Sequence, residues 1–284
     1  MNINFPLKLE PSVIENYQAK GFILTPNVLK RAEIDEYGAA VDAEVARRNQ
    51  EDTRNVSEKS TYEQSFIQCM RLWETSAAVR ALSCSPLLGG MAAQLMGVER
   101  VQLWQDQALY KEAGGRKTDA HQDQPFWPIG DVPLISAWIP FDDVTIKDGA
   151  MAYVPGSHKA GRLKIVDITH NSTPYEILDD PALNGESPVS VDVDAGSIVW
   201  HSGYTVHQAS ANISGNTRRV FTVVFFADGY KRSKPWPVFP LDRAGVAVGD
   251  IMQGEGMPLV WPPSAKLPEP PELLGQTTGP QHTV

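Results

Sequence analysis

The chain has 284 residues, enough to bury one large core, and we expect a single domain. Its formal net charge of -9 argues against a nucleic-acid partner or an anionic membrane surface, because phosphate contacts need clustered Lys and Arg. No stretch approaches the roughly 18 apolar residues of a membrane span, and the N-terminus lacks the pattern of a signal peptide. Cys69 and Cys84 belong to no metal-binding cluster, which favours buried thiols in a reducing, cytoplasmic compartment. The expected partner is a small molecule.

The first hundred residues are predicted to be mainly helical. Along "AEIDEYGAAVDAEVARR" the apolar side chains recur at steps of three and four residues, as Ile34, Tyr37, Val41 and Val45. A second helix is expected between Ser85 as N-cap, with Pro86 at its first position, and Gly97 as the stop.

From about Val101 the pattern changes to short apolar or alternating runs separated by Gly, Pro, Asn and Asp. These runs are "VQLWQDQALY", "LISAWIPF", "AMAYVPG", "VSVDVDAGSIVW" and "RRVFTVVFFA". Short strands without intervening helices predict an all-β core over residues 101–230, a sandwich or jelly roll that can hold a ligand between its sheets. The proline-rich residues 231–284 show no periodicity and are interpreted as a surface wrap with a flexible end.

The stretch "TDAHQDQPFW" places His121 two residues before Asp123. A His-X-Asp pair with one distant histidine is the ligand set of non-haem Fe(II) oxygenases, which leaves three coordination positions open for a 2-oxo acid and dioxygen. His207 is followed eleven residues later by Arg218, across a turn rich in Asn, Gly and Ser. If that turn closes a hairpin, the two residues face each other on adjacent strands, and the arginine can bind the far carboxylate of the 2-oxo acid.

Two other histidines are weaker candidates for the metal site. His201 could replace His207 as the ligand, but it has no arginine at the hairpin distance, so packing or hydrogen bonding at a strand end is favoured. His158 follows a Pro-Gly turn and is interpreted as a loop residue.

Residues 101–227 resemble the phytanoyl-CoA dioxygenase family of Fe(II)- and 2-oxoglutarate-dependent oxygenases. The similarity runs through "HQD", "SAWIPFDDVTIKDGAMAYVPGSHK", "AGSIVWHSGYTVHQASAN" and "TRRVFTVVFF", in the family's order. The resemblance implies a double-stranded β-helix, with mainly helical residues 1–100 packed outside it. It also implies that His121, Asp123 and His207 bind iron, that Arg218 binds the C5 carboxylate of 2-oxoglutarate, and that Trp138 lines the cosubstrate pocket.

Further side chains are assigned from strand alternation. Gln105, Gln107 and Leu109 share one face of a strand, and Ser136 shares a face with Trp138, so these faces either line the interior or meet solvent. We assign Gln107 and Ser136 to the cosubstrate. The substrate is assigned to Gln105, Phe126 and Trp127, although core packing is the alternative for the two aromatic residues.

The cationic side chains near these positions have simpler interpretations. Arg219 must point to the opposite sheet face from Arg218, toward solvent or the sheet surface. Arg116 and Lys117, just before the histidine, could contact an anionic substrate, but a solvated charge run is favoured.

The predicted function is hydroxylation of an unactivated C–H bond in a small organic molecule, coupled to decarboxylation of 2-oxoglutarate with dioxygen. Relatives that halogenate carry Gly or Ala at the carboxylate position, so Asp123 favours oxygenation, with desaturation or ring chemistry as the alternative outcomes of the same oxidation. The alternative is a cupin-like isomerase, hydrolase or binding protein without redox activity, since jelly rolls carry all of these. Arg218 and Trp138 argue against that alternative, because a metal-bound water needs neither.

Overall fold

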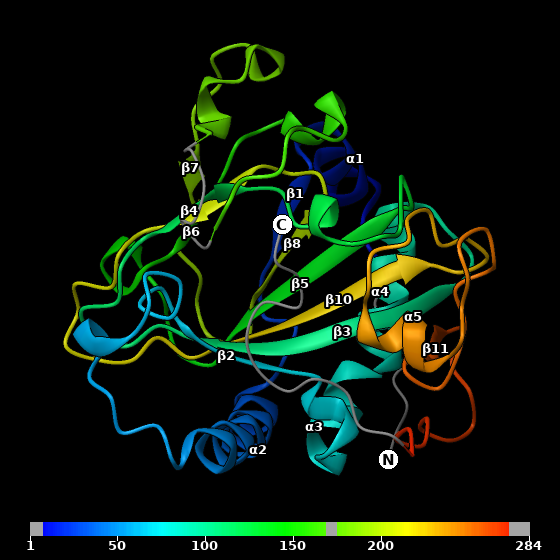
Figure 1. The fold of residues 1–284 in the computed structure, drawn as a ribbon, viewed down its shortest axis with the longest axis horizontal. Helices are drawn as coiled ribbons and strands as arrows, with labels where there is room; N and C mark the ends of the chain where they lie inside the picture. The colour runs from blue at the N-terminus through cyan, green and yellow to red at the C-terminus, as the bar shows by residue number, and fades with distance from the viewer. Residues whose placement is uncertain (1–7, 169–174, 273–284) are drawn as a thin grey trace.

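The computed structural model describes residues 8–168 and 175–272, and in them two antiparallel sheets face each other (Figure 1). The large sheet has the strand order β1 (Phe22–Thr25), β8 (Ile198–Ser202), β5 (Leu134–Pro140), β10 (Val220–Ala227), β3 (Val101–Tyr110) and β11 (Leu259–Trp261), with β2 (Ile67–Met70) also paired to β3. The small sheet has the order β4 (Thr118–His121), β9 (His207–Ala209), β6 (Met151–Tyr153) and β7 (Val189–Ser190). The predicted double-stranded β-helix is confirmed.

Helices cover the side of the large sheet that faces away from the small one (Figure 1). They are α1 (Pro11–Lys20), α2 (Arg31–Asn49), α3 (Ala77–Ser83) and α4 (Pro86–Met96). The predicted apolar stripe of α2 is buried at Ile34, Val41 and Val45. The bounds of α4 agree with the prediction, since Gly97 ends it in the left-handed conformation, with φ of 68°.

The strands of the large sheet direct alternate side chains to two different environments. On β10, Phe221, Val223 and Phe225 pack into the core beneath the helices. Thr222 points the other way, into the space between the two sheets. A bulge in β3 opposite Val224 and Phe225 shifts the alternation, and beyond it Gln105, Gln107 and Leu109 face that interior.

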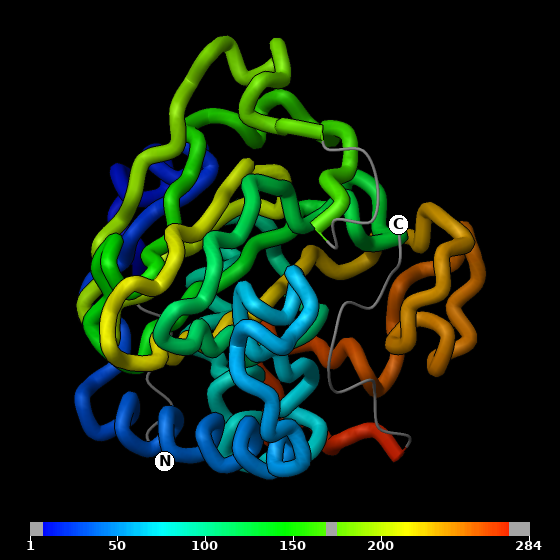
Figure 2. Tube along the Cα trace, turned by 60° about the vertical axis from the view of Figure 1, so that its left-hand side comes forward, coloured from blue at the N-terminus to red at the C-terminus, as the bar shows by residue number. Residues whose placement is uncertain are grey.

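Both ends of the chain contribute strands that the sequence did not predict. β1 and β2 belong to the first hundred residues, and their short length hides them among helical patterns. The proline-rich C-terminal segment supplies α5 (Phe239–Arg243) and β11. Figure 2 shows its orange part protruding from one side of the molecule. Residues 273–284, part of the predicted flexible end, lie outside the described residues.

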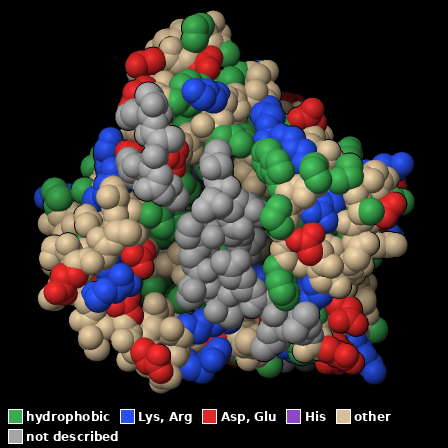
Figure 3. All heavy atoms as spheres, viewed as in Figure 1, with side chains coloured by type: hydrophobic (Ala, Val, Ile, Leu, Met, Phe, Trp, Pro, Cys, Tyr) green, Lys and Arg blue, Asp and Glu red, His purple; other side chains and the backbone are tan. Residues whose placement is uncertain are grey.

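Short 3-10 turns connect many of the strands. Their bounds are Val56–Glu58, Leu72–Glu74, Gln124–Phe126, Ile146–Asp148, Ser157–Ala160, Ile177–Asp179 and Pro181–Leu183. Cys69 and Cys84 are buried free thiols, as predicted. On the face in Figure 3, acidic and basic side chains are intermingled. Among the described residues, no helix combines the length and the apolar character needed to cross a membrane.

Candidate active site

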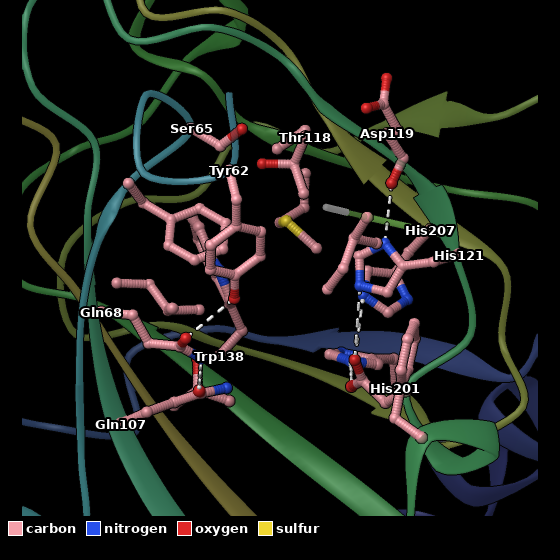
Figure 4. A pocket seen from close by; sticks show the side chains of 18 of the residues that line it. Tyr62, Ser65, Gln68, Gln107, Thr118, Asp119, His121, Trp138, His201 and His207 are labelled. Atoms are coloured by element: carbon pink, nitrogen blue, oxygen red, sulfur yellow. Dashed lines mark hydrogen bonds and ion pairs between the residues drawn. The ribbon is translucent and has the colours of Figure 1, made fainter. Parts of the chain in front are cut away.

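His121, Asp123 and His207 meet between the two sheets. His121 ends β4 and is the register partner of His207, which begins β9. One ligand atom from each of the three residues lies within 4.8 Å of the others. Asp123 Oδ1 lies 3.6 Å from Nε2 of both histidines (Figure 4 shows the two rings together).

The backbone fixes the orientation and the tautomer of both histidines. His121 Nδ1 lies 2.7 Å from the carbonyl oxygen of Asp119, and His207 Nδ1 lies 2.9 Å from that of Thr205. A carbonyl oxygen can only accept, so each Nδ1 carries a proton, and in its neutral form each ring directs the lone pair of Nε2 at the cluster. This arrangement can bind a divalent metal ion.

The charge state of the cluster also suits a metal ion. Burial lowers the pKa of His207 to about 3, so its ring is neutral at physiological pH. Burial alone would raise the pKa of Asp123, but the neighbouring histidines, His207 first, hold it well below its usual range. The carboxylate therefore stays ionised, and although burial opposes it, the hydrogen bond and the charge of Asp123 raise the pKa of His121.

His201 contacts the same carboxylate in a different way. Its Nε2 lies 3.1 Å from Asp123 Oδ2, and Ser136 Oγ donates to that oxygen at 3.3 Å. Because a carboxylate only accepts, His201 presents an N–H and not a lone pair. These contacts favour His207 over His201 as the ligand. They also place Ser136, predicted to contact the cosubstrate, against Asp123.

Arg218 is a buried cation that lines the same cavity. It donates to the carbonyl oxygens of Gly149 and, at 3.5 Å, Leu109, and its guanidinium carbon lies 5.6 Å from the ring centre of Trp138. Within the described residues, no carboxylate forms an ion pair with it. Burial lowers its pKa to about 10, so it remains charged at neutral pH.

Lys111 is the backbone partner of Arg218 and is also fully buried. Its Nζ donates to the carbonyl oxygen of Arg116 and to Thr118 Oγ1, at 3.3 Å for the latter. Burial, followed by repulsion from Arg218 and Arg116, lowers the pKa of Lys111 to about 6. At neutral pH the arginine therefore carries the positive charge of this pair.

The predicted hairpin between His207 and Arg218 is wrong. His207 belongs to β9 in the small sheet, whereas Arg218 pairs with Lys111 and leads into β10 of the large sheet. The loop between them crosses from one sheet to the other, and Asn212 anchors it by donating to the carbonyl oxygens of Lys111 and Asn216. The two residues still line one cavity, but from opposite sheets.

The cavity between the sheets has a volume of about 140 Å³, roughly ten times the room that one water needs. Its lining includes the predicted residues Gln105, Gln107, Phe126, Trp127, Trp138 and Arg218. Among the described residues, five buried polar atoms in this lining have no hydrogen-bond partner: Gln105 Oε1, Trp138 Nε1, His201 Nδ1, Thr222 Oγ1 and Arg218 Nε. Buried polar atoms are normally paired, so this cavity is suited to a polar ligand.

A family model described as phytanoyl-CoA dioxygenase (PhyH) matches residues 17–220. The chain belongs to this family. Its predicted membership is confirmed, and the match also covers most of the helical N-terminal region.

Curated proteins and solved structures agree with this membership. A phytanoyl-CoA dioxygenase of Arabidopsis thaliana is 28% identical over 144 residues, 50% of each chain. A probable alpha-ketoglutarate-dependent hypophosphite dioxygenase of Stutzerimonas stutzeri is 25% identical over 60% of this chain and 58% of its own. The matched segments thus span about half the length of these relatives. The solved structure of the non-heme alpha ketoglutarate dependent carbocyclase SnoK from nogalamycin biosynthesis is 26% identical, with a TM-score of 0.73 over 89% of this chain and 98% of that one.

Four other side chains that the sequence suggested are paired with carboxylates or lie outside the cavity lining. Arg116 lines the cavity but is bound to Asp119 Oδ2 at 3.0 and 3.1 Å, and Lys117 is paired with the same carboxylate. Arg219 points away from the cavity and pairs with Asp42 and Asp142. His158 contacts the carbonyl oxygen of Gln18, outside the cavity lining.

One wall of the cavity was not predicted from the sequence. It comes from the segment that leads into β2 and from β2 itself, with Tyr62, Ser65, Phe66, Gln68 and Met70. The four-residue strand lies in a region of helical patterns, and only its pairing with β3 brings these side chains to the site.

Proposed function

We propose that the protein is an Fe(II)- and 2-oxoglutarate-dependent oxygenase that hydroxylates an unactivated C–H bond of a small organic molecule. The observation that carries this proposal is Arg218, a buried cation without a carboxylate partner among the described residues, in the same cavity as His121, Asp123 and His207. A cation held in this way matches the far carboxylate of a 2-oxo acid. Family membership and the similarity to alpha-ketoglutarate-dependent enzymes support the same conclusion.

The residues present fit the iron ion. His121 and His207 would each give Nε2, and Asp123 would give Oδ1, which together leave positions open for 2-oxoglutarate and dioxygen. With its cosubstrates, the iron supplies the oxidation of the C–H bond, while 2-oxoglutarate becomes succinate and carbon dioxide. His201 and Ser136 hold the second oxygen of Asp123 and keep the first directed at the histidines.

The residues present also fit 2-oxoglutarate. Arg218 would bind the C5 carboxylate, while the indole of Trp138 packs against the guanidinium group and limits its orientations. The unpartnered hydroxyl of Thr222, which stands opposite Trp138 across β10 and β5, would donate to the same ligand. We infer that these residues bind and orient the cosubstrate.

The substrate is proposed to be a small, largely apolar molecule of the natural-product, terpenoid, amino-acid-derived or carboxylic-acid type. Phe126, Trp127, Tyr62, Phe66, Met70 and Ile168 contribute apolar surface to the cavity. Such a wall excludes water and binds a substrate mainly through burial of apolar area.

A second candidate is an oxidation that ends in ring closure. The carbocyclase that the chain resembles at 26% identity has this outcome in its name, and it covers 89% of the present chain. The binding of iron and 2-oxoglutarate would be the same, so the two candidates differ in the product alone. The non-redox cupin alternative is disfavoured by Arg218, which is buried and has no carboxylate partner in residues 8–168 and 175–272.

The test compares Arg218→Met with Arg219→Met, which changes the neighbouring cation on the other face of the strand. Loss of a charge-assisted carboxylate contact should weaken 2-oxoglutarate binding by roughly 2 to 5 kcal/mol in Arg218→Met and leave Arg219→Met near the wild type. Binding is measured without oxygen as thermal stabilisation of the Mn(II) protein by 2-oxoglutarate. Absence of stabilisation in the wild type, or equal affinity in both variants, would refute the proposal.

A further inference from the structure

Three side chains on the unpredicted wall form one hydrogen-bonded row. The hydroxyl of Tyr62 donates to Gln68 Oε1 at 2.8 Å, and Gln68 Nε2 donates to Gln107 Oε1 at 2.7 Å. All three side chains line the cavity, and Figure 4 shows them on the side opposite the histidines.

Strand pairing holds this row in place. In the antiparallel register of β2 and β3, Met70 stands opposite Gln107, so Gln68 is the diagonal neighbour of Gln107 on the same face. Tyr62 packs edge-on against Phe66, with the ring centres 5.4 Å apart, which limits where its hydroxyl can point. The row therefore links the N-terminal segment to the central strand of the site.

The donor-to-acceptor direction of the hydrogen bonds in the row determines which polar group of Gln107 is available to a ligand. Its carbonyl oxygen is engaged by Gln68, so the amide nitrogen, with its two N–H groups, is left for the cavity. We propose that Tyr62 and Gln68 fix Gln107 as a hydrogen-bond donor that selects substrates carrying an acceptor oxygen toward this wall. This inference rests on the proposed function, and it assigns Gln107 to the substrate and not to the cosubstrate as the sequence predicted.

The charges around the row favour an uncharged acceptor oxygen on the substrate. Arg116, the cation that lines this part of the cavity, is already bound to Asp119 through two nitrogens. Tyr62, Gln68 and Gln107 carry no charge. A substrate carboxylate would thus be removed from water without a free cation, whereas a ketone or ether oxygen needs only the N–H of Gln107. The selected substrate class is an apolar molecule with a ketone, quinone or ether oxygen.

Gln68→Glu should reverse this selection. A carboxylate at position 68 accepts from both neighbours, from the hydroxyl of Tyr62 and from the amide of Gln107. Gln107 must then turn its N–H groups toward position 68 and its carbonyl oxygen toward the cavity. The variant changes one functional group and keeps the size of the side chain.

Two bicyclic probes of similar size report the direction of the row. 1-Indanone has an acceptor only, and indole has a donor only. Their dissociation constants are measured without oxygen on protein loaded with Mn(II) and 2-oxoglutarate, by paramagnetic broadening of the probe proton signals. The measurement is repeated by saturation transfer on metal-free protein, so that it reports on this wall even where 2-oxoglutarate fails to bind.

The wild type should prefer 1-indanone by about fivefold, and Gln68→Glu should prefer indole by a similar factor. Gln68→Met, which removes both contacts, should bring the ratio close to one. The matched control is Gln64→Glu, the same change in the same segment but outside the cavity lining, and it should keep the wild-type ratio.

An unchanged ratio in Gln68→Glu, or failure of the wild type to bind 1-indanone, would overturn the inference. Neither result would affect the proposed function if 2-oxoglutarate still stabilises the Mn(II) protein. Failure of that stabilisation would instead overturn the proposed function, while the probe ratios on metal-free protein would still decide whether the row selects an acceptor.

Discussion

The two faces of the large sheet differ in how their buried polar atoms are paired, although the same strands supply both. The outer face packs Phe221, Val223 and Phe225 beneath the helices. The inner face carries Thr222 and Gln105, each with a buried oxygen that has no partner among the described residues. Since an unpaired buried polar atom costs stability, the part of the inner face that lines the cavity is suited to a ligand.

Two buried charged groups show the same contrast. On the outer side, Asp106 accepts hydrogen bonds from the backbone N–H groups of Leu72 and Trp73 and from the hydroxyl of Ser83. Burial raises its pKa to about 6, and these donors oppose that rise. Arg218, on the cavity side, has carbonyl oxygens and an aromatic ring as neighbours but no anion among the described residues. The protein completes the first environment by itself and leaves the second for a ligand.

The largest expected effect is on the cavity side, at the metal cluster. His207→Ala removes a Nε2 ligand and should lower 2-oxoglutarate turnover by more than about 100-fold, whereas His201→Ala disturbs only the position of Asp123 and should cost about tenfold. Succinate formation and iron content after anaerobic desalting are measured for both. A greater loss in His201→Ala would reverse the ligand assignment.

The next effect is on stability and belongs to the outer face. Asp106→Asn replaces one of the two acceptor oxygens by an N–H₂ group, which cannot accept from the three donors that surround it. The variant should therefore lose about 2 kcal/mol of unfolding free energy. Urea unfolding measures the loss. Asp42→Asn, at a partly exposed carboxylate, is the control and should cost less than about 1 kcal/mol. Equal losses of unfolding free energy in Asp106→Asn and Asp42→Asn would show that burial of the acceptor does not increase its contribution to stability.

A pH-dependent effect is expected from Lys111. Burial lowers its pKa to about 6, whereas the unfolded chain keeps a value near 10.4, so between these values the unfolded state binds one more proton. Through this group, wild-type stability therefore rises with pH across that window. Lys111→Met removes this dependence, and its stability relative to the wild type should fall by about 2 kcal/mol from pH 6.5 to 8.5. Thermal unfolding measures the stability difference between Lys111→Met and the wild type at pH 6.5 and at pH 8.5. If this difference is the same at both pH values, Lys111 stays charged in the folded protein.

The smallest effect compares two hydroxyl groups. Thr222→Val removes a buried hydroxyl without a partner and should leave stability unchanged or raise it by about 0.5 kcal/mol, while weakening 2-oxoglutarate binding a few-fold. Ser83→Ala removes a hydroxyl that donates to Asp106 and should destabilise the protein by about 1 kcal/mol. Thermal unfolding with and without 2-oxoglutarate separates the two effects. A clear loss of stability in Thr222→Val would contradict the contrast between the faces.

Local patterns were sufficient to predict much of the fold. The stripe of α2, the Pro86 and Gly97 boundaries of α4, and the alternating run of β3 depend on neighbours a few residues away, so they can be read from the chain. The short strands β1 and β2 were missed because four residues carry too little periodicity. Their place in the sheet comes from long-range pairing, of β1 with β8 and of β2 with β3.

The sequence by itself determined which residue types are available for the proposed chemistry of the site. His121 and Asp123 are two residues apart, and His207 and Arg218 stand in recognisable motifs, so the ligand types follow from local spacing and family resemblance. Only the tertiary structure decided how they meet. His207 and Arg218 approach from opposite sheets and not along a hairpin, because the loop between them passes from the small sheet to the large one. The row from Tyr62 through Gln68 to Gln107 was decided in the same way, since hydrogen bonds over 39 residues of separation depend on which strands pair, and no local pattern records that choice.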